Sequence, residues 1–214
     1  PMADEIPLEP PACDPTPTLA LLPGSRRSEV EALGPVFLRT AVWLQERVPG
    51  LRIRIPCASP ALRTLLEEQC AAIAGLTAVQ LHDGDARAVM TSARAVLLAS
   101  GTAALEAMLL KRPMVVAYRV SPVTAWLARR LLRVPHVSLP NLIADAPLVP
   151  EFLQDAVRVD TLGPALLAHF TGATADGALQ QRFADIHRRL RLDASAQAAE
   201  ALIALARLDG RSAS

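Results

Sequence analysis

Cysteine is scarce in this sequence and forms none of the patterns that hold metals or disulfide frameworks. Cys13, Cys57 and Cys70 are an odd number, with no C-x-x-C pair and no clustered histidines. Neither a zinc site nor a disulfide scaffold is indicated, and a reducing compartment is favoured. Long apolar runs are also lacking, since none approaches the ~18 residues of a membrane span. Without a secretory-type start either, we expect a cytoplasmic chain.

Excess charge of one sign is the next absence. The formal net charge is +1, which argues against a nucleic-acid partner bound through a broad basic surface. Hydrophobic residues make up 51% of the 214 positions, and such a composition is globular rather than disordered. A chain of this length buries one sizeable core, with room for an appended helical segment.

Apolar runs alternate with helical patterns along the first two thirds of the chain. This alternation predicts an α/β fold, a Rossmann-like parallel sheet with helices on both faces. The expected strands are 19–22, 51–55, 78–81, 95–99 and 114–118, and the expected helices are about 29–47, 60–74, one after Asp85 and one containing Glu106.

The periodicity changes after Leu139. We expect an irregular stretch over 140–150 and then helices near 161–170, 175–191 and 195–208. The opening, rich in proline, is typical of an interdomain linker. The predicted organisation is a linker at 1–17, a Rossmann-like domain at 18–172 and a helical tail at 173–214.

One motif carries most of the functional signal, the turn Ser100-Gly101-Thr102 between the strand 95–99 and a helix. Small residues at a helix start let backbone N–H groups approach phosphate oxygens, and the helix dipole adds positive potential. Glu106 lies one helical turn further on, where its carboxylate can accept hydrogen bonds from both hydroxyls of a ribose. The alternative is an ordinary turn whose small residues only permit tight packing.

A second turn of this kind follows the first strand at Gly24-Ser25-Arg26. Gly24 gives access to the backbone, and Arg26 supplies a cation that neutralises a leaving diphosphate without a metal. The alternative is structural: Ser28 and Glu31 have the spacing of a capping box.

Asp83-Gly84-Asp85 imitates the D-x-D pattern of metal-dependent glycosyltransferases. We expect no metal there, because Asp85 is suited to cap the following helix and no third oxygen ligand is evident. His82, at a strand end, has at most a minor contact with a nucleotide.

An amphipathic helix is expected over 123–133. It places an indole beside three guanidinium groups, an arrangement that suits an anionic membrane surface. The commoner alternative is a packing helix with a solvated basic face. The residues concerned are Trp126, Arg129, Arg130 and Arg133.

With these residues assembled, the chain resembles the lipid-A-disaccharide synthases, glycosyltransferases of the GT-B class. The similarity runs in order along almost the whole chain, and includes the tail around 197–199. The matching stretches are 22–26 with 29–30, 83–84, 97–106, 113–116 with 118–119, 137–142 and 149–154.

The resemblance implies the carboxyl-terminal, donor-binding half of a metal-independent, inverting enzyme. Such an enzyme joins UDP-2,3-diacylglucosamine to 2,3-diacylglucosamine 1-phosphate through a β-1,6 bond and releases UDP. Such an enzyme works on the inner face of the inner membrane and needs no cofactor. Its general base comes from the other half. The resemblance leaves undecided whether the chain forms a homodimer. By analogy, Gly24, Ser25, Arg26, Ser100, Gly101 and Thr102 bind the diphosphate, Glu106 binds the ribose, and Asn141, Glu151 and Gln154 face the donor sugar.

Two further classes stay open at this point. One is another GT-B enzyme or epimerase acting on a UDP-sugar, and the other is a UDP-binding module without catalysis. A dinucleotide dehydrogenase is disfavoured because no G-x-G-x-x-G follows the first strand.

Overall fold

Six parallel strands form one sheet in the computed structural model, which describes residues 2–12, 14–119, 136–174 and 176–191. The spatial order is β3-β2-β1-β4-β5-β6, so the direction of progression reverses between β1 and β4. The strands are β1 (Thr18–Leu22), β2 (Arg52–Cys57), β3 (Val79–Asp83), β4 (Ala95–Ala99), β5 (Met114–Tyr118) and β6 (Glu151–Leu153).

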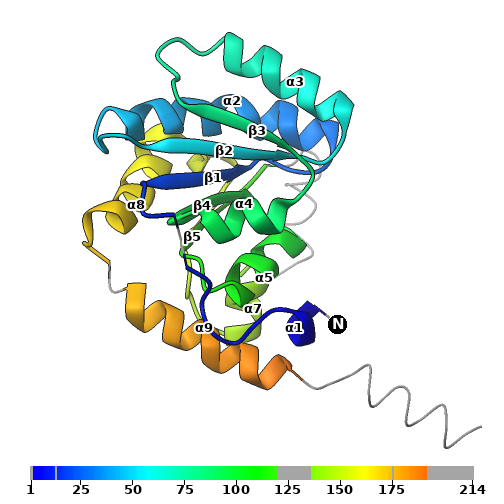
Figure 1. Cartoon of the computed structure of the whole chain (residues 1–214), viewed down its shortest axis with the longest axis vertical. Helices are drawn as coiled ribbons and strands as arrows, with labels where there is room; N and C mark the ends of the chain where they lie inside the picture. The colour runs from blue at the N-terminus through cyan, green and yellow to red at the C-terminus, as the bar shows by residue number, and fades with distance from the viewer. Residues whose placement is uncertain (1, 13, 120–135, 175, 192–214) are drawn as a thin grey trace, which may run out of the picture.

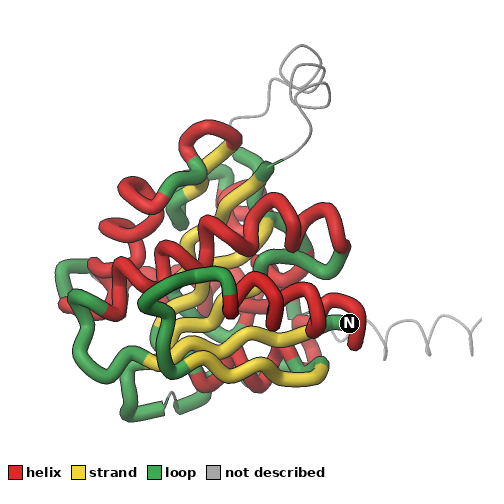
Figure 2. The backbone as a smooth tube through the Cα atoms, turned by 90° about the horizontal axis from the view of Figure 1, so that it is seen from above, coloured by secondary structure: helices red, strands yellow, loops and turns green. Residues whose placement is uncertain are grey.

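Helices cover both faces of this sheet (Figure 1 and Figure 2). One face packs against α2 (Arg27–Gln45), α3 (Pro60–Ala71) and α8 (Val159–Thr171). The other packs against α4 (Ala86–Ser92), α5 (Thr102–Leu109), α7 (Leu139–Ala144), α9 (Asp176–Leu190) and the short α1 (Met2–Glu5). The Rossmann-like fold class expected from the sequence is therefore confirmed.

The central strands are buried from end to end, as their continuous apolar character predicts. Every residue of β1 and β4 is buried. Strand β2 differs, because only Ile53, Ile55 and Cys57 of its six residues are buried. Its opposite face carries Arg54, which donates to Asp14 at 3.2 Å. A strand near the sheet edge needs apolar residues only on the face that a helix covers.

The stretch 140–150, expected to be irregular, contains most of helix α7, so that expectation was wrong there, and the strand β6 at 151–153 was not expected. Asn141, in α7, is buried and bonds both backbone groups of Val149, each at 2.9 Å. These two hydrogen bonds hold the chain next to the sheet, where β6 pairs with β5 over three residues. Both elements depend on tertiary contacts, which local periodicity does not record. The helices expected at 123–133 and 195–208 lie outside the described residues.

The N-terminal segment 2–12, which we name the strap, lies along α5 and α9 (Figure 1). Its Ala3 and Ile6 are buried in the same apolar cluster as Phe183 of α9. Its backbone carbonyls are also bonded by buried side chains of the domain. Lys111 Nζ donates to the carbonyl of Pro7 at 2.7 Å, and an Arg112 nitrogen donates to that of Pro11. The strap therefore packs as part of the sheet domain.

A buried pair of ionisable groups, Lys111 and His187, holds the strap in place. Lys111 Nζ lies 2.6 Å from His187 Nδ1, and His187 Nε2 lies 2.8 Å from the Ala3 carbonyl oxygen. His187 therefore donates through Nε2 and accepts at Nδ1, which is the neutral form. Burial lowers the pKa of Lys111 to about 8 and also lowers the pKa of His187 below 6.5.

We predict that His187 makes stability fall in acid. Because the pKa of His187 is lower in the folded state, the unfolded chain takes up more protons below pH 6.5. Each pKa unit by which folding lowers the pKa of His187 adds about 1.4 kcal/mol to the free energy of unfolding at neutral pH. This contribution is lost as pH falls through the folded-state pKa. Urea unfolding of wild type and His187→Gln at pH 5, 6 and 7.5 measures it. The stability advantage of the wild type should shrink toward pH 5, and a constant difference would contradict the assignment.

Candidate functional site

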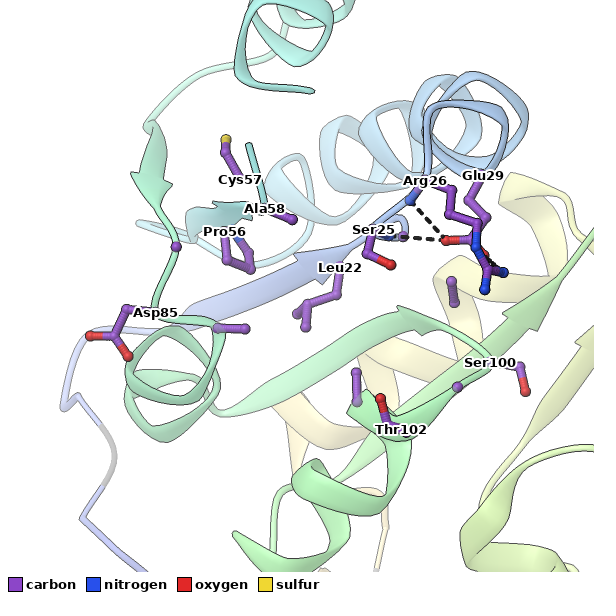
Figure 3. Close-up of a pocket in the computed structure, with 16 residues that line it drawn as sticks. Leu22, Ser25, Arg26, Glu29, Pro56, Cys57, Ala58, Asp85, Ser100 and Thr102 are labelled. Carbon is purple, nitrogen blue, oxygen red and sulfur yellow. Dashed lines mark hydrogen bonds and ion pairs between the residues drawn. The ribbon is translucent and has the colours of Figure 1, made fainter. Parts of the chain in front are cut away.

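A cavity of about 520 Å³ lies at the carboxyl ends of β1, β2 and β4. In open parallel sheets, ligands bind in the crevice where the strand order reverses, here between β1 and β4. The volume is within the range of small-molecule sites. Figure 3 shows Ser25 and Arg26 on one side of this cavity and Ser100 and Thr102 across from them. The structure thus brings together the two turns that the sequence singled out.

The first turn, between β1 and α2, is built around the carboxylate of Glu29. Glu29 Oε2 accepts from the backbone N–H of Ser25 at 3.0 Å and of Arg26 at 3.2 Å, and Oε1 accepts from Arg26 Nη1 at 3.2 Å (Figure 3). A Cβ on Gly24, whose φ is +134°, would lie 2.4 Å from Glu29 Cβ. Glycine is required here because Glu29 occupies that space.

This arrangement corrects the expected capping box. Helix α2 begins at Arg27, with Arg26 as its N-cap, so Glu29 and not Glu31 receives the N-cap amide. Glu31 instead accepts from Arg27 Nε at 2.8 Å on the helix surface. Sequence reasoning gave Glu29 no role, although E at the third helical position is the signal of such a cap. The side chain of Arg26 is 80% exposed on the cavity rim, where it can meet an anion.

The second turn, between β4 and α5, leaves its helix N-terminus open to the cavity. Ser100 is tied to the sheet, because its N–H donates to the Ala117 carbonyl at 3.1 Å. Gly101 is the N-cap, and a Cβ there would meet no atom within 4 Å. Among the described residues, the N–H groups of Thr102 and Ala103 have no acceptor. Unpaired N–H groups at a helix start beside empty space can donate hydrogen bonds to an anion.

The third wall of the cavity was missed by sequence reasoning. It comes from β2 and from the turn before α4, through Pro56, Cys57, Ala58, Gly84, Asp85 and Ala86. Burial raises the pKa of the Cys57 thiol, so this cysteine lines the site as an apolar group rather than a nucleophile. Only the sheet topology places β2 beside β1, and no local motif marks Pro56, Cys57 or Ala58.

The acidic turn before α4 has the structural role predicted for it. Asp85 is the N-cap of α4, and its Oδ1 accepts from the Ala88 N–H at 3.1 Å. Asp83 instead accepts from Arg63 Nη1 at 2.8 Å. In the part of the chain that the structure describes, no group of three or more His, Cys, Asp or Glu side chains is placed to hold a metal ion. His82 is not among the residues that line the cavity.

Glu106 lies just beyond the cavity, one turn further along α5 than Thr102. Its side chain is 15% exposed, and its Oε1 accepts from Arg87 Nε at 2.7 Å. Arg87 follows directly on Ala86, a cavity residue at the start of α4. The assignment of Glu106 to a ribose stays a prediction, now with an arginine partner that the sequence did not reveal.

Two of the residues expected at the donor sugar are joined to each other away from the cavity. Asn141 Nδ2 donates to Glu151 Oε1 at 2.8 Å, and the Glu151 carboxylate also accepts from the N–H groups of Val137 and Ser138. Gln154 has a φ of +51°, and its carbonyl accepts from Arg119 Nε at 3.4 Å. None of these three lines the 520 Å³ cavity. They fasten the 137–154 region, while their sugar contact stays a prediction.

The residues expected at a membrane surface, Trp126, Arg129, Arg130 and Arg133, lie outside the described part of the chain. Within that part, the helices are all too short or too polar to cross a bilayer.

The strand order and the covering helices define a Rossmann-like α/β domain, with the cavity at the switch point of its sheet. Two solved structures share this fold at low sequence identity. The C-terminal CMP-Kdo-binding domain of WaaA from Acinetobacter baumannii matches with a TM-score of 0.55 and 13% identity, over 84% of this chain and 90% of that one. A spinosyn rhamnosyltransferase complexed with thymidine diphosphate matches with a TM-score of 0.54 and 18% identity, over 83% of this chain and 43% of that one.

Sequence comparison gives the family. Residues 1–202 match the family model described as lipid-A-disaccharide synthetase, and the chain belongs to that family. The lipid-A-disaccharide synthase of Chromohalobacter salexigens is 52% identical over 88% of this chain and 49% of its own length. That of Pseudomonas putida is 47% identical over 96% of this chain and 56% of its own length. The chain therefore spans about half the length of the curated relatives it matches.

We predict that Gly24→Ala destabilises the chain by about 3 kcal/mol, because the new Cβ requires Glu29 to leave the turn and because a φ of +134° is strained for alanine. Gly84→Ala is the matched control. It lies on the same cavity at a φ of +67° with nothing within 4 Å, and should cost only about 1 kcal/mol. Urea unfolding measures both, and equal losses would show that Glu29 does not fill the turn.

Proposed function

We propose that this chain is the donor-binding part of a lipid-A-disaccharide synthase. In this proposal it binds UDP-2,3-diacylglucosamine, whose sugar is transferred to the 6-hydroxyl of 2,3-diacylglucosamine 1-phosphate with release of UDP. The observation that carries the proposal is the cavity at the β1–β4 switch point, bordered by an open helix N-terminus and an exposed arginine. Membership of the family supports the choice of substrates.

The diphosphate is assigned to the space between the two turns. The N–H groups of Thr102 and Ala103, with the α5 dipole behind them, face one phosphate. Arg26 faces the other from across the cavity. The two turns work differently, because the amides of Ser25 and Arg26 already donate to Glu29. The first turn therefore acts through its guanidinium and the second through its backbone.

Charge neutralisation is the chemical contribution of this part. As the bond from the anomeric carbon to the diphosphate breaks, negative charge grows on the leaving phosphate. A guanidinium and helix-terminal N–H groups that are already in place stabilise that charge without reorganising. The pairing of Arg26 with Glu29 limits the positions of the guanidinium before the donor arrives.

The attack itself needs a base that this chain does not supply in the proposal. Inversion requires the acceptor hydroxyl to approach in line, on the side of the anomeric carbon opposite the diphosphate. The base therefore belongs to the part of the longer relatives that this chain does not span. Both substrates are acylated, so we place the reaction at the inner face of the inner membrane, and no cofactor is required.

The donor-sugar residues are assigned an indirect place in this scheme. Glu151 holds the backbone of Val137 and Ser138, and Ser100 Oγ donates to the Val137 carbonyl at 3.5 Å. The network of Asn141 and Glu151 thus supports the edge of the second turn. In this proposal, these residues and Gln154 shape the sugar side of the crevice.

We predict that UDP stabilises the isolated chain and that NAD does not. At about 100 times its Kd, UDP adds roughly 2.7 kcal/mol, which corresponds to a rise in Tm of roughly 5–10 °C. Glu106→Ala should reduce this rise because the ribose hydroxyls lose their acceptor. Differential scanning calorimetry measures it. Absence of any UDP effect on folded protein would overturn the proposal.

Gly101→Ala separates binding from folding. Its Cβ enters empty space on an extended backbone, so stability should change by less than about 1 kcal/mol, while the methyl group takes the place proposed for a phosphate and weakens UDP binding at least about tenfold. Gly177→Ala, on α9 with nothing within 4 Å, is the control that should leave affinity unchanged. Titration calorimetry measures the affinity of each variant for UDP. An unchanged affinity in Gly101→Ala would place the phosphates elsewhere.

A further inference from the structure

We infer that Arg87 is a positioning residue for nucleotide recognition: it holds the Glu106 carboxylate so that the site selects a ribose over a 2′-deoxyribose. The inference rests on the proposed function and adds to it the determinant of sugar selection in the nucleotide. The two residues are 19 apart in sequence and lie on different helices, α4 and α5.

The pair joins two walls of the cavity. Ala86, directly before Arg87, lines the cavity at the start of α4, and Thr102 and Ala103 line it at the start of α5. One helical turn of α5 separates Thr102 from Glu106. The Arg87–Glu106 bond therefore fixes the carboxylate one helical turn beyond the residues assigned to the phosphate. In a nucleoside diphosphate the ribose is attached to the phosphates, so we place the ribose next to this carboxylate.

Arg87 occupies one carboxylate oxygen of Glu106 and leaves the other for a nucleotide. Arg87 Nε donates to Oε1 at 2.7 Å, a short charge-assisted bond. With the Glu106 side chain only 15% exposed, a rotation that breaks this bond would leave a nearly buried carboxylate without its cation. Arg87 thus limits the rotamers of Glu106 before a nucleotide arrives. Oε2 is the atom that we assign to the ribose hydroxyls.

The second partner of Arg87 provides a control. Arg87 Nη2 lies 3.8 Å from Glu5 Oε2 on the strap, and the Glu5 side chain is 62% exposed, whereas that of Glu106 is 15% exposed. An exposed ion pair at this distance contributes little. The arginine is therefore held chiefly by Glu106, and the loss of Glu5 should not disturb nucleotide selection.

The test compares the Kd of UDP with that of 2′-deoxy-UDP by titration calorimetry, in wild type and in Arg87→Met, Arg87→Lys, Glu106→Gln and Glu5→Gln. Wild type should prefer UDP by about tenfold, the value of one hydrogen bond to a charged acceptor. In Arg87→Met, UDP should weaken toward the affinity of 2′-deoxy-UDP, which itself should stay unchanged. Arg87→Lys should restore part of the preference, and Glu5→Gln should keep all of it.

The double variant Arg87→Met/Glu106→Gln should show the same preference for UDP over 2′-deoxy-UDP as Glu106→Gln alone, because Arg87 acts only through Glu106. An unchanged preference in Arg87→Met would overturn the inference. Equal weakening of both nucleotides would also overturn it, since Arg87 would then contact the phosphates or support the fold. A wild type that binds both nucleotides equally would remove the ribose assignment but leave the proposed function standing. A wild type that binds neither would overturn both.

Discussion

The pairing of β1 with β4 is the constraint on which the rest of the structure depends. Both strands are buried throughout, and the helices that follow them leave toward opposite faces of the sheet. Two neighbouring strand ends whose chains diverge cannot close the space between them, so a crevice opens there. The same divergence aims the start of α5 at that crevice and sets Arg26 on its other side. The site is thus a consequence of topology, which small residues and one arginine make suitable for an anion.

Several polar side chains outside the crevice bond distant segments of the chain to one another. Lys111 and His187 hold the strap, and Glu151 holds the turn before α7. Buried polar groups are costly unless they are paired, so these networks order segments that regular secondary structure does not reach. The N–H groups of Thr102 and Ala103 at the start of α5 contrast with them, because they have no acceptor in the part of the chain that the structure describes.

The sequence predicted the features that local pattern encodes. β4 and β5 begin and end where the apolar runs indicated, and Asp85 caps α4 as its residue type suggested. The three-residue β6 could not be found, because its conformation is set by pairing with β5. The cap of α2 was assigned two residues too late, at Ser28, since Arg26 is an unusual N-cap and hid the role of Glu29. Arg87 could not be connected with Glu106 from spacing, because only the sheet order brings α4 beside α5.

The crevice as a diphosphate site can be tested residue by residue with ¹H–¹⁵N spectra recorded during a UDP titration. The account predicts that the largest shifts belong to the amides of Gly101, Thr102 and Ala103, because these N–H groups gain acceptors. The amides of Ser25 and Arg26 should shift less, since Glu29 already bonds them. Shifts confined to the region around Asn141 and Glu151, with the start of α5 unaffected, would contradict the account.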